Sequence, residues 1–195
     1  FMEFTTDILK EASKIGSKEV EKSLSVLSGQ AVKVKTAVAE LVDYDFVNMD
    51  AQKEVGSHSV IVYAQMIQGV DGASLLMINR ESALSLIDLL TKQEVGSTGV
   101  ILDLDRSAIK ETLNILSNSY LNALSRLANK ELLIGSPFVV TADSISRTFK
   151  NLKAKNADTH LLAFKTTLQI DKYKVEANLY LILDKDFANL LEDNK

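Results

Sequence analysis

The apolar positions of the chain recur with two different periods. Between residues 104 and 129 they return every three or four residues and, at 100° per residue, fall within about 100° of arc. This stripe consists of Ile109, Leu113, Leu116, Tyr120, Ala123, Leu124 and Leu127. The pattern predicts an amphipathic helix over 104–129, and a similar stripe predicts a second long helix over 4–28.

The remaining segments predict shorter elements. Two further helices are expected over 80–93 and from 185 to the end of the chain. Segments rich in β-branched and aromatic residues predict six strands, at 31–42, 58–67, 73–79, 131–142, 160–169 and 174–183. Turn residues at 69–72 and 171–172 predict two hairpins. The stretch 94–102 is typical of a linker.

The two halves of the chain resemble each other. Shifting the sequence by 100 residues gives seven identities in the 32 positions from 7 to 38, where about two are expected by chance. Farther along, the offset becomes 105, so that 76–81 lies over 181–186 and the second half carries an insertion near 144–157. The sequence therefore predicts an internal repeat of 4–93 and 104–195.

Each half has the order helix, strand, hairpin, helix. We therefore predict an α/β fold, a two-layer α/β sandwich with a pseudo-two-fold internal repeat, in which a six-stranded sheet carries both long helices on one face. A length of 195 residues fits a single domain over 1–195.

Composition and charge exclude several classes of protein. The absence of cysteine excludes disulfide scaffolds, thiolate catalysis and cysteine metal sites, and is typical of a cytoplasmic protein. With 22 basic and 26 acidic residues the net charge is −4, which argues against nucleic acid as a partner. No apolar run approaches the roughly 18 residues of a membrane-spanning helix, so no membrane association is expected.

Common catalytic motifs are missing from the sequence. There is no glycine-rich phosphate loop, no G-x-S-x-G turn and no H-E-x-x-H pair. The two histidines, His58 and His160, fall at roughly corresponding places in the halves. A metal site built on them would need carboxylates as well. We therefore expect no metal held by this chain.

The polar face of the second long helix carries the strongest candidate chemistry. Ser107, Glu111 and Asn114 stand at i, i+4 and i+7, which places them along one line of the helix. A solvated face is the ordinary explanation of such a trio. However, asparagine favours a helix less than Glu, Lys or Gln does, and this face contains Asn114, Asn118 and Asn122. The only proline of the chain, Pro137, follows Asn114 after 22 intervening residues.

The series Ser107-x3-Glu111-x2-Asn114-x22-Pro137 resembles the [D/S]-x3-E-x2-N-x22-P signature of the CheC, CheX and FliY phosphatases of chemotaxis. The duplicated unit extends this resemblance over essentially the whole chain. Within the family the chain looks most like CheC, since CheX is shorter and the chain ends at Lys195 without the appended domain expected of FliY.

The resemblance implies a protein phosphatase that hydrolyses the acyl phosphate of the response regulator CheY. By position, Asn114 would hold the attacking water, and Glu111 would pair with a lysine of the partner. Ser107 would support the site, and Pro137 would shape the exit of the next strand. The chain would need no cofactor of its own, because Mg²⁺ would be held by phosphorylated CheY.

The first half departs from the signature. Asp7 and Glu11 keep the first two positions, but Lys14 replaces the asparagine and Ala37 replaces the proline. An ammonium group has three donors and no acceptor, so it cannot accept a hydrogen bond from water. We therefore expect one active site, on the second long helix, and a degenerate first site.

A non-catalytic role is the alternative. The resemblance extends to the middle domains of flagellar switch proteins, which are binding modules, and CheC proteins also bind the receptor deamidase CheD. An adaptor for CheD or for the flagellar switch would not need an asparagine at position 114. The joint presence of Glu111 and Asn114 favours the phosphatase.

Overall fold

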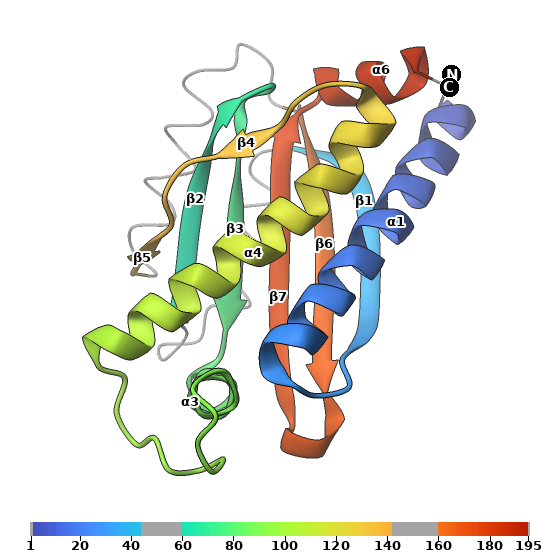
Figure 1. The fold of residues 1–195 in the computed structure, drawn as a ribbon. Helices are drawn as coiled ribbons and strands as arrows, with labels where there is room; N and C mark the ends of the chain where they lie inside the picture. The colour runs from blue at the N-terminus through green and yellow to red at the C-terminus, as the bar shows by residue number, and fades with distance from the viewer. Residues whose placement is uncertain (1, 44–59, 142–159, 195) are drawn as a thin grey trace.

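The computed structural model describes residues 2–43, 60–141 and 160–194 (Figure 1). Its helices are α1 (Met2–Ser28), α3 (Arg80–Leu90), α4 (Asp103–Ala128), α6 (Asp186–Asp193) and a single 3-10 turn, η1 (Asp171–Tyr173). Its strands are β1 (Lys33–Asp43), β2 (Val60–Gln68), β3 (Gly72–Ile78), β4 (Leu133–Ile134), β5 (Phe138–Val140), β6 (His160–Ile170) and β7 (Val175–Asp184). No helix in these described ranges is long and apolar enough to span a bilayer.

The strands form one antiparallel sheet in the order β1-β6-β7-β3-β2-β4, and β5 pairs with β2 beside this path. In Figure 1 both long helices, α1 and α4, lie across the same face of the sheet. The predicted two-layer α/β class is confirmed.

The predicted number of strands is wrong, because the sheet has seven strands where six were expected. The predicted strand 131–142 is divided into β4 and β5, and residues 135–137 lie between them. Gly135 still donates its backbone N–H to the carbonyl of Gln65 at 2.8 Å. Pro137 has no N–H to donate to a ladder, so a strand that reaches it is interrupted there.

The strand order has an internal symmetry. Exchanging β1 with β4, β2 with β6 and β3 with β7 returns the same order in reverse. This order is what a duplicated unit would give, and the duplication itself stays a prediction.

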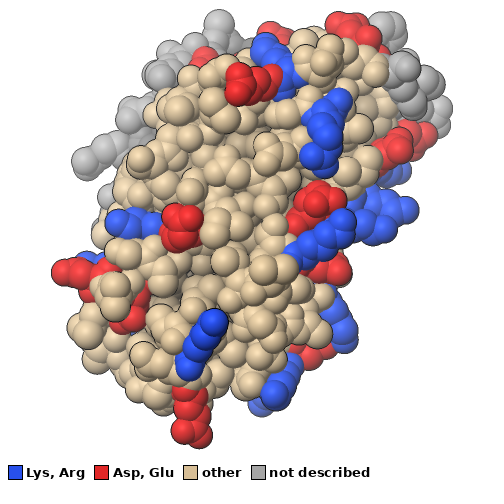
Figure 2. Space-filling model, viewed as in Figure 1, with Lys and Arg blue, Asp and Glu red and all other residues tan. Residues whose placement is uncertain are grey.

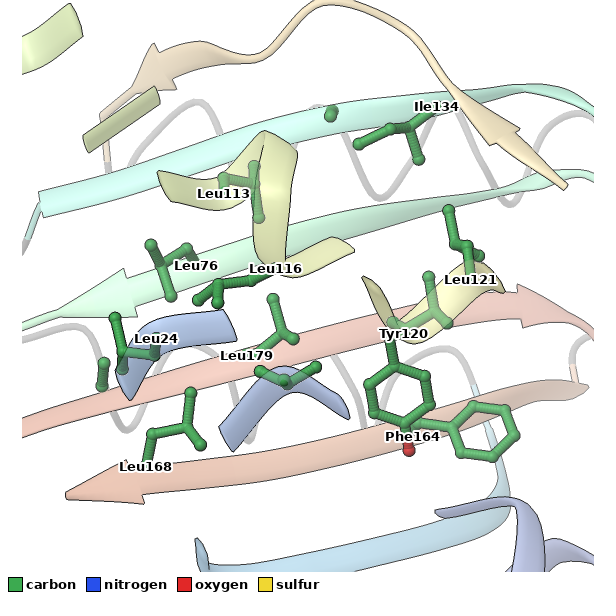
Figure 3. Close-up of a cluster of buried hydrophobic side chains, with 14 of the residues drawn as sticks. Leu24, Leu76, Leu113, Leu116, Tyr120, Leu121, Ile134, Phe164, Leu168 and Leu179 are labelled. Atoms are coloured by element: carbon green, nitrogen blue, oxygen red, sulfur yellow. The ribbon is translucent and has the colours of Figure 1, made fainter. Parts of the chain in front are cut away.

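The main core lies between the helices and the sheet and draws on both halves of the chain. The stripe predicted for α4 is buried from Ile109 to Leu124, with every member at most 1% exposed. In Figure 3, the Tyr120 ring of α4 lies against Phe164 of β6, in an edge-to-face arrangement with centroids 5.6 Å apart. Each buried leucine or phenylalanine of this kind stabilises the fold by about 1.5–3 kcal/mol. The polar side of α4 is therefore held outward by the packing of the opposite side.

The linker before α4 is fastened to α3 by a buried carboxylate. Asp88 is 0% exposed and accepts hydrogen bonds from Gly96 N (2.8 Å), Ser97 Oγ (3.0 Å) and Thr98 N (3.1 Å). Burial by itself raises the pKa of Asp88, but these hydrogen bonds outweigh burial and hold the pKa below its usual value. The chain is thereby directed from α3 into α4.

Candidate functional site

The helix α4 places three of the four signature residues on its outer face. Ser107 and Glu111 are exposed, and Asn114 is half-buried. The start of the helix is fixed by Asp105, whose carboxylate accepts the backbone N–H of Leu102 at 2.8 Å. Ser107 donates its hydroxyl to the carbonyl of Asp103 at 3.1 Å, within the first turn.

The fourth residue, Pro137, lies between β4 and β5 and is half-buried. Both strands contact α4. Ser107, Glu111 and Asn114 therefore share one face of α4, and Pro137 lies between two strands that contact the same helix.

Glu111 is available for a partner. Its side chain is exposed and, within the described ranges of the chain, forms no ion pair with a lysine or arginine. A carboxylate of this kind can accept hydrogen bonds from a cation brought by another protein.

The amide of Asn114 has a partner on its own helix. Asn118 donates from Nδ2 to Oδ1 of Asn114 at 3.0 Å, one turn further along α4. Asn118 is also half-buried. The sequence places Asn118 on the polar face, but the contact with Asn114 was not predicted. Its only signal in the sequence is the i, i+4 spacing of two asparagines.

Exposed apolar side chains precede the polar line along the chain. Val100, Leu102 and Leu104 are 66%, 65% and 77% exposed, and Leu104 comes one turn before Ser107 on the same side of α4. Figure 2, viewed as in Figure 1, shows acidic and basic side chains spread over the helix-covered side, with neither sign gathered into a large patch. Apolar groups beside a few polar ones are typical of a surface that binds another protein.

The corresponding residues of the first half lie on α1. Asp7, Glu11 and Lys14 are all exposed, and Asp7 forms a long ion pair of 3.9 Å with Lys10. Ala37, at the place of the proline, is exposed on β1. The first half therefore presents a carboxylate line with an ammonium group where α4 presents an amide.

The two histidines are not brought together as a described site. His160 is the exposed first residue of β6, and His58 lies outside the described residues. Among residues 2–43, 60–141 and 160–194, no group of three or more His, Asp or Glu side chains could hold a metal ion.

A partly open hollow of about 540 Å³ lies at the end of α3. It is lined by Ser28, Gln30, Leu89, Lys92, Gln93, Glu94, Val95 and Tyr173. None of the signature residues belongs to it. Ser107, Glu111 and Asn114 instead lie on the outer face of α4, where a reacting group would have to be presented by a partner.

Comparison with known proteins gives matches in structure. No protein-family model matches the sequence, and no curated protein matches it. FliY from Thermotoga maritima has a similar structure, with a TM-score of 0.72 and 17% identity over 98% of this chain and 97% of that one. The CheX–CheY–BeF3–Mg²⁺ complex from Borrelia burgdorferi is also similar, with a TM-score of 0.58 and 11% identity over 91% of this chain and 98% of that one. The FliG–FliM complex from H. pylori has a TM-score of 0.65 and 11% identity over 90% of this chain and 91% of that one.

The chain therefore has the fold of the CheC, CheX and FliY proteins, which the FliM middle domain also resembles. The likeness indicated by the signature is confirmed at the level of the fold. Whether the chain is closest to CheC within this group stays a prediction.

Proposed function

We propose that this protein is a cytoplasmic phosphatase that hydrolyses the acyl phosphate of a CheY-type response regulator. The observation that carries the proposal is the line of Ser107, Glu111 and Asn114 on the outer face of α4, in a chain with this fold. CheX, another protein with this fold, has been solved in complex with CheY, BeF3 and Mg²⁺. That complex supports a CheY-type partner for this chain.

Asn114 would act by positioning. Phosphoryl transfer from an acyl phosphate to water requires a water in line with the scissile bond, and it depends mainly on alignment and electrostatics. A carboxamide can accept one hydrogen bond from that water and donate another, and it stays neutral beside the phosphoryl oxygens. The water supplies the oxygen of the phosphate released, and the aspartate of the partner leaves as a carboxylate.

Glu111 would act as the anchor of the complex. One turn before Asn114, its exposed carboxylate would pair with a lysine of the partner and fix the register of the two proteins. Mg²⁺ would be bound by carboxylates of the partner, so this chain would need no cofactor of its own. The exposed Leu104 and Leu102 would lie at the margin of the same interface.

The test is the rate at which a phosphorylated CheY-type regulator loses phosphate with and without this protein. Asn114→Ala should lower that rate on the order of a hundredfold, because the water loses its alignment. Glu111→Ala should raise KM as well as lower kcat. Asn122→Ala is the matched control, since Asn122 is an exposed asparagine two turns further along α4. Equal rates for the wild type and Asn114→Ala would contradict the catalytic assignment.

An adaptor is the second candidate, and the likeness to FliM supports it. FliM, another protein with a similar structure, has been solved in complex with FliG, which supports a flagellar switch protein as a partner of this chain. A protein that binds the regulator, a switch protein or CheD, with no effect on the phosphate, would be such an adaptor. Binding measured in the same samples as turnover separates the two functions.

A further inference from the structure

The hydrogen bond between Asn118 and Asn114 has a consequence for the proposed reaction, on which the following inference rests. Asn118 Nδ2 donates to Asn114 Oδ1 at 3.0 Å. It is the hydrogen bond that the described part of the chain provides to the Asn114 side chain. Both side chains are half-buried, so water competes for this bond less than it does on the exposed turns before and after.

This hydrogen bond fixes the orientation of the Asn114 amide group. An amide rotates about its last side-chain torsion and presents either oxygen or nitrogen to a given direction. With Oδ1 turned toward Asn118, one lone pair of that oxygen is occupied, and the second lone pair and both N–H groups stay available. One acceptor site and a donor are what a positioned water requires.

The first half provides a natural contrast. The 100-residue offset places Lys14 and Lys18 at the positions of Asn114 and Asn118, and both lysines are exposed. Two ammonium groups repel each other and have no acceptor, so α1 cannot form this pair. The amide pair is a property of α4.

We infer that Asn118 is a positioning residue, which holds the Asn114 amide in its reactive orientation before the partner binds. The step from the bound complex to the transition state then does not have to immobilise a rotating Asn114 side chain. Without the bond, kcat should fall by the factor that corresponds to ordering one side chain, about three- to tenfold.

Two substitutions test the inference by kinetics. Asn118→Ala removes the donor and should lower kcat about three- to tenfold with KM unchanged, since Asn118 itself does not touch the partner in this proposal. Asn118→Asp keeps the shape but offers acceptors alone, so Asn114 must turn its Nδ2 toward the new carboxylate and its Oδ1 away. We expect the aspartate variant to lose more activity than the alanine variant. Asn122→Asp is the matched control, because it adds the same charge one turn further along.

A measurement independent of activity tests the contact itself. In ¹⁵N relaxation, the side-chain amide of Asn114, assigned by its disappearance in Asn114→Ala, should be ordered in the wild type and mobile in Asn118→Ala. Equal order in the two proteins would overturn the inference.

The kinetic outcomes separate the two proposals. A wild-type protein without phosphatase activity would refute the proposed function, and the relaxation result would still decide whether Asn118 holds Asn114. If the wild type is active and Asn114→Ala is not, wild-type kcat in both Asn118 variants would overturn the positioning role alone. The role would also be wrong if Asn122→Asp lost as much activity as Asn118→Asp.

Discussion

The attachment of the interhelical linker to Asp88 gives a quantitative prediction about stability. We consider Asp88→Asn, which preserves the size of the side chain and removes its charge. The carboxylate is 0% exposed and accepts from Gly96, Ser97 and Thr98, all within 3.1 Å. An amide offers one oxygen in place of two, and its NH2 group must face at least one of these donors.

The expected loss of stability follows from the hydrogen bonds that Asp88 accepts. A hydrogen bond to a charged group contributes about 1.5–3 kcal/mol, and two of the three contacts use the oxygen Oδ1 while the third uses Oδ2. The substitution therefore removes one or two charged contacts and weakens the rest. Gly96 and Ser97 are exposed, so their donors can form hydrogen bonds to water when Asp88 no longer accepts them. The full desolvation penalty of a buried, unpaired donor therefore does not apply. We expect the free energy of unfolding to fall by about 2–4 kcal/mol.

The effect should depend on pH. The hydrogen bonds hold the pKa of Asp88 in the folded protein below its value in the unfolded chain. The unfolded chain therefore binds the proton more readily, so the contribution of Asp88 is complete above an unfolded pKa of about 4. It is lost as the pH falls through the lower, folded pKa. The difference between the wild type and Asp88→Asn should thus be largest near neutral pH and should shrink in acid.

Urea unfolding followed by circular dichroism at several pH values between 7 and 3 measures this difference. Asp71→Asn, at an exposed carboxyl in a hairpin turn, is the matched control and should change stability little. A stability of Asp88→Asn equal to that of the wild type, or a loss that stays constant down to pH 3, would show that the charged contacts do not hold the linker.

Two further substitutions test the packing of α1 against α4 and the one-site hypothesis. Gly16→Ala should lower the free energy of unfolding, measured in urea, by about 1–2 kcal/mol. The added Cβ would lie 2.5 Å from Cδ1 and Cζ of the Tyr120 ring, and this overpacking outweighs the gain in helix propensity. A variant more stable than the wild type would contradict this packing. Lys14→Ala should leave phosphatase turnover nearly unchanged, because an ammonium group cannot accept a hydrogen bond from the attacking water. Activity that survives Asn114→Ala and disappears when Lys14→Ala is added would overturn the one-site hypothesis.

The regular elements could be predicted from the sequence because periodicity reports burial. The stripe of α4 is the clearest case, since Leu113, Leu116 and Tyr120 are all buried as predicted. The fold class followed from the same patterns. The division of the strand at 131–142 was missed, although Pro137 is visible in the sequence. Apolar residues continue on both sides of the proline, and periodicity alone does not show which backbone groups pair.

The side-chain contacts could not be predicted in the same way. The signature marks Ser107, Glu111 and Asn114, but nothing in it distinguishes Asn118 from a solvated asparagine. Asp88 lies within a helical stretch as an ordinary acidic residue, and its partners follow eight to ten residues later, in a linker without a regular pattern. Contacts of this kind depend on which segments the tertiary fold brings together, and local sequence propensity does not encode this.

The arrangement of α4 makes stability and activity separable. Its buried side, represented by Tyr120 and Leu116, packs against α1 and the sheet, whereas Asn114 and Asn118 interact with each other on the outer side. Substitutions on the buried side should therefore change the free energy of unfolding first and activity through it. Substitutions of the amide pair should change turnover in a protein that unfolds like the wild type. The same helix in the first half, α1, carries Lys14 and Lys18 on its outer side and is equally well packed by Val20 and Leu24 on its inner side. Both helices are therefore held by their buried sides, and of the two it is α4 that carries on its outer face the amide pair required by the proposed reaction.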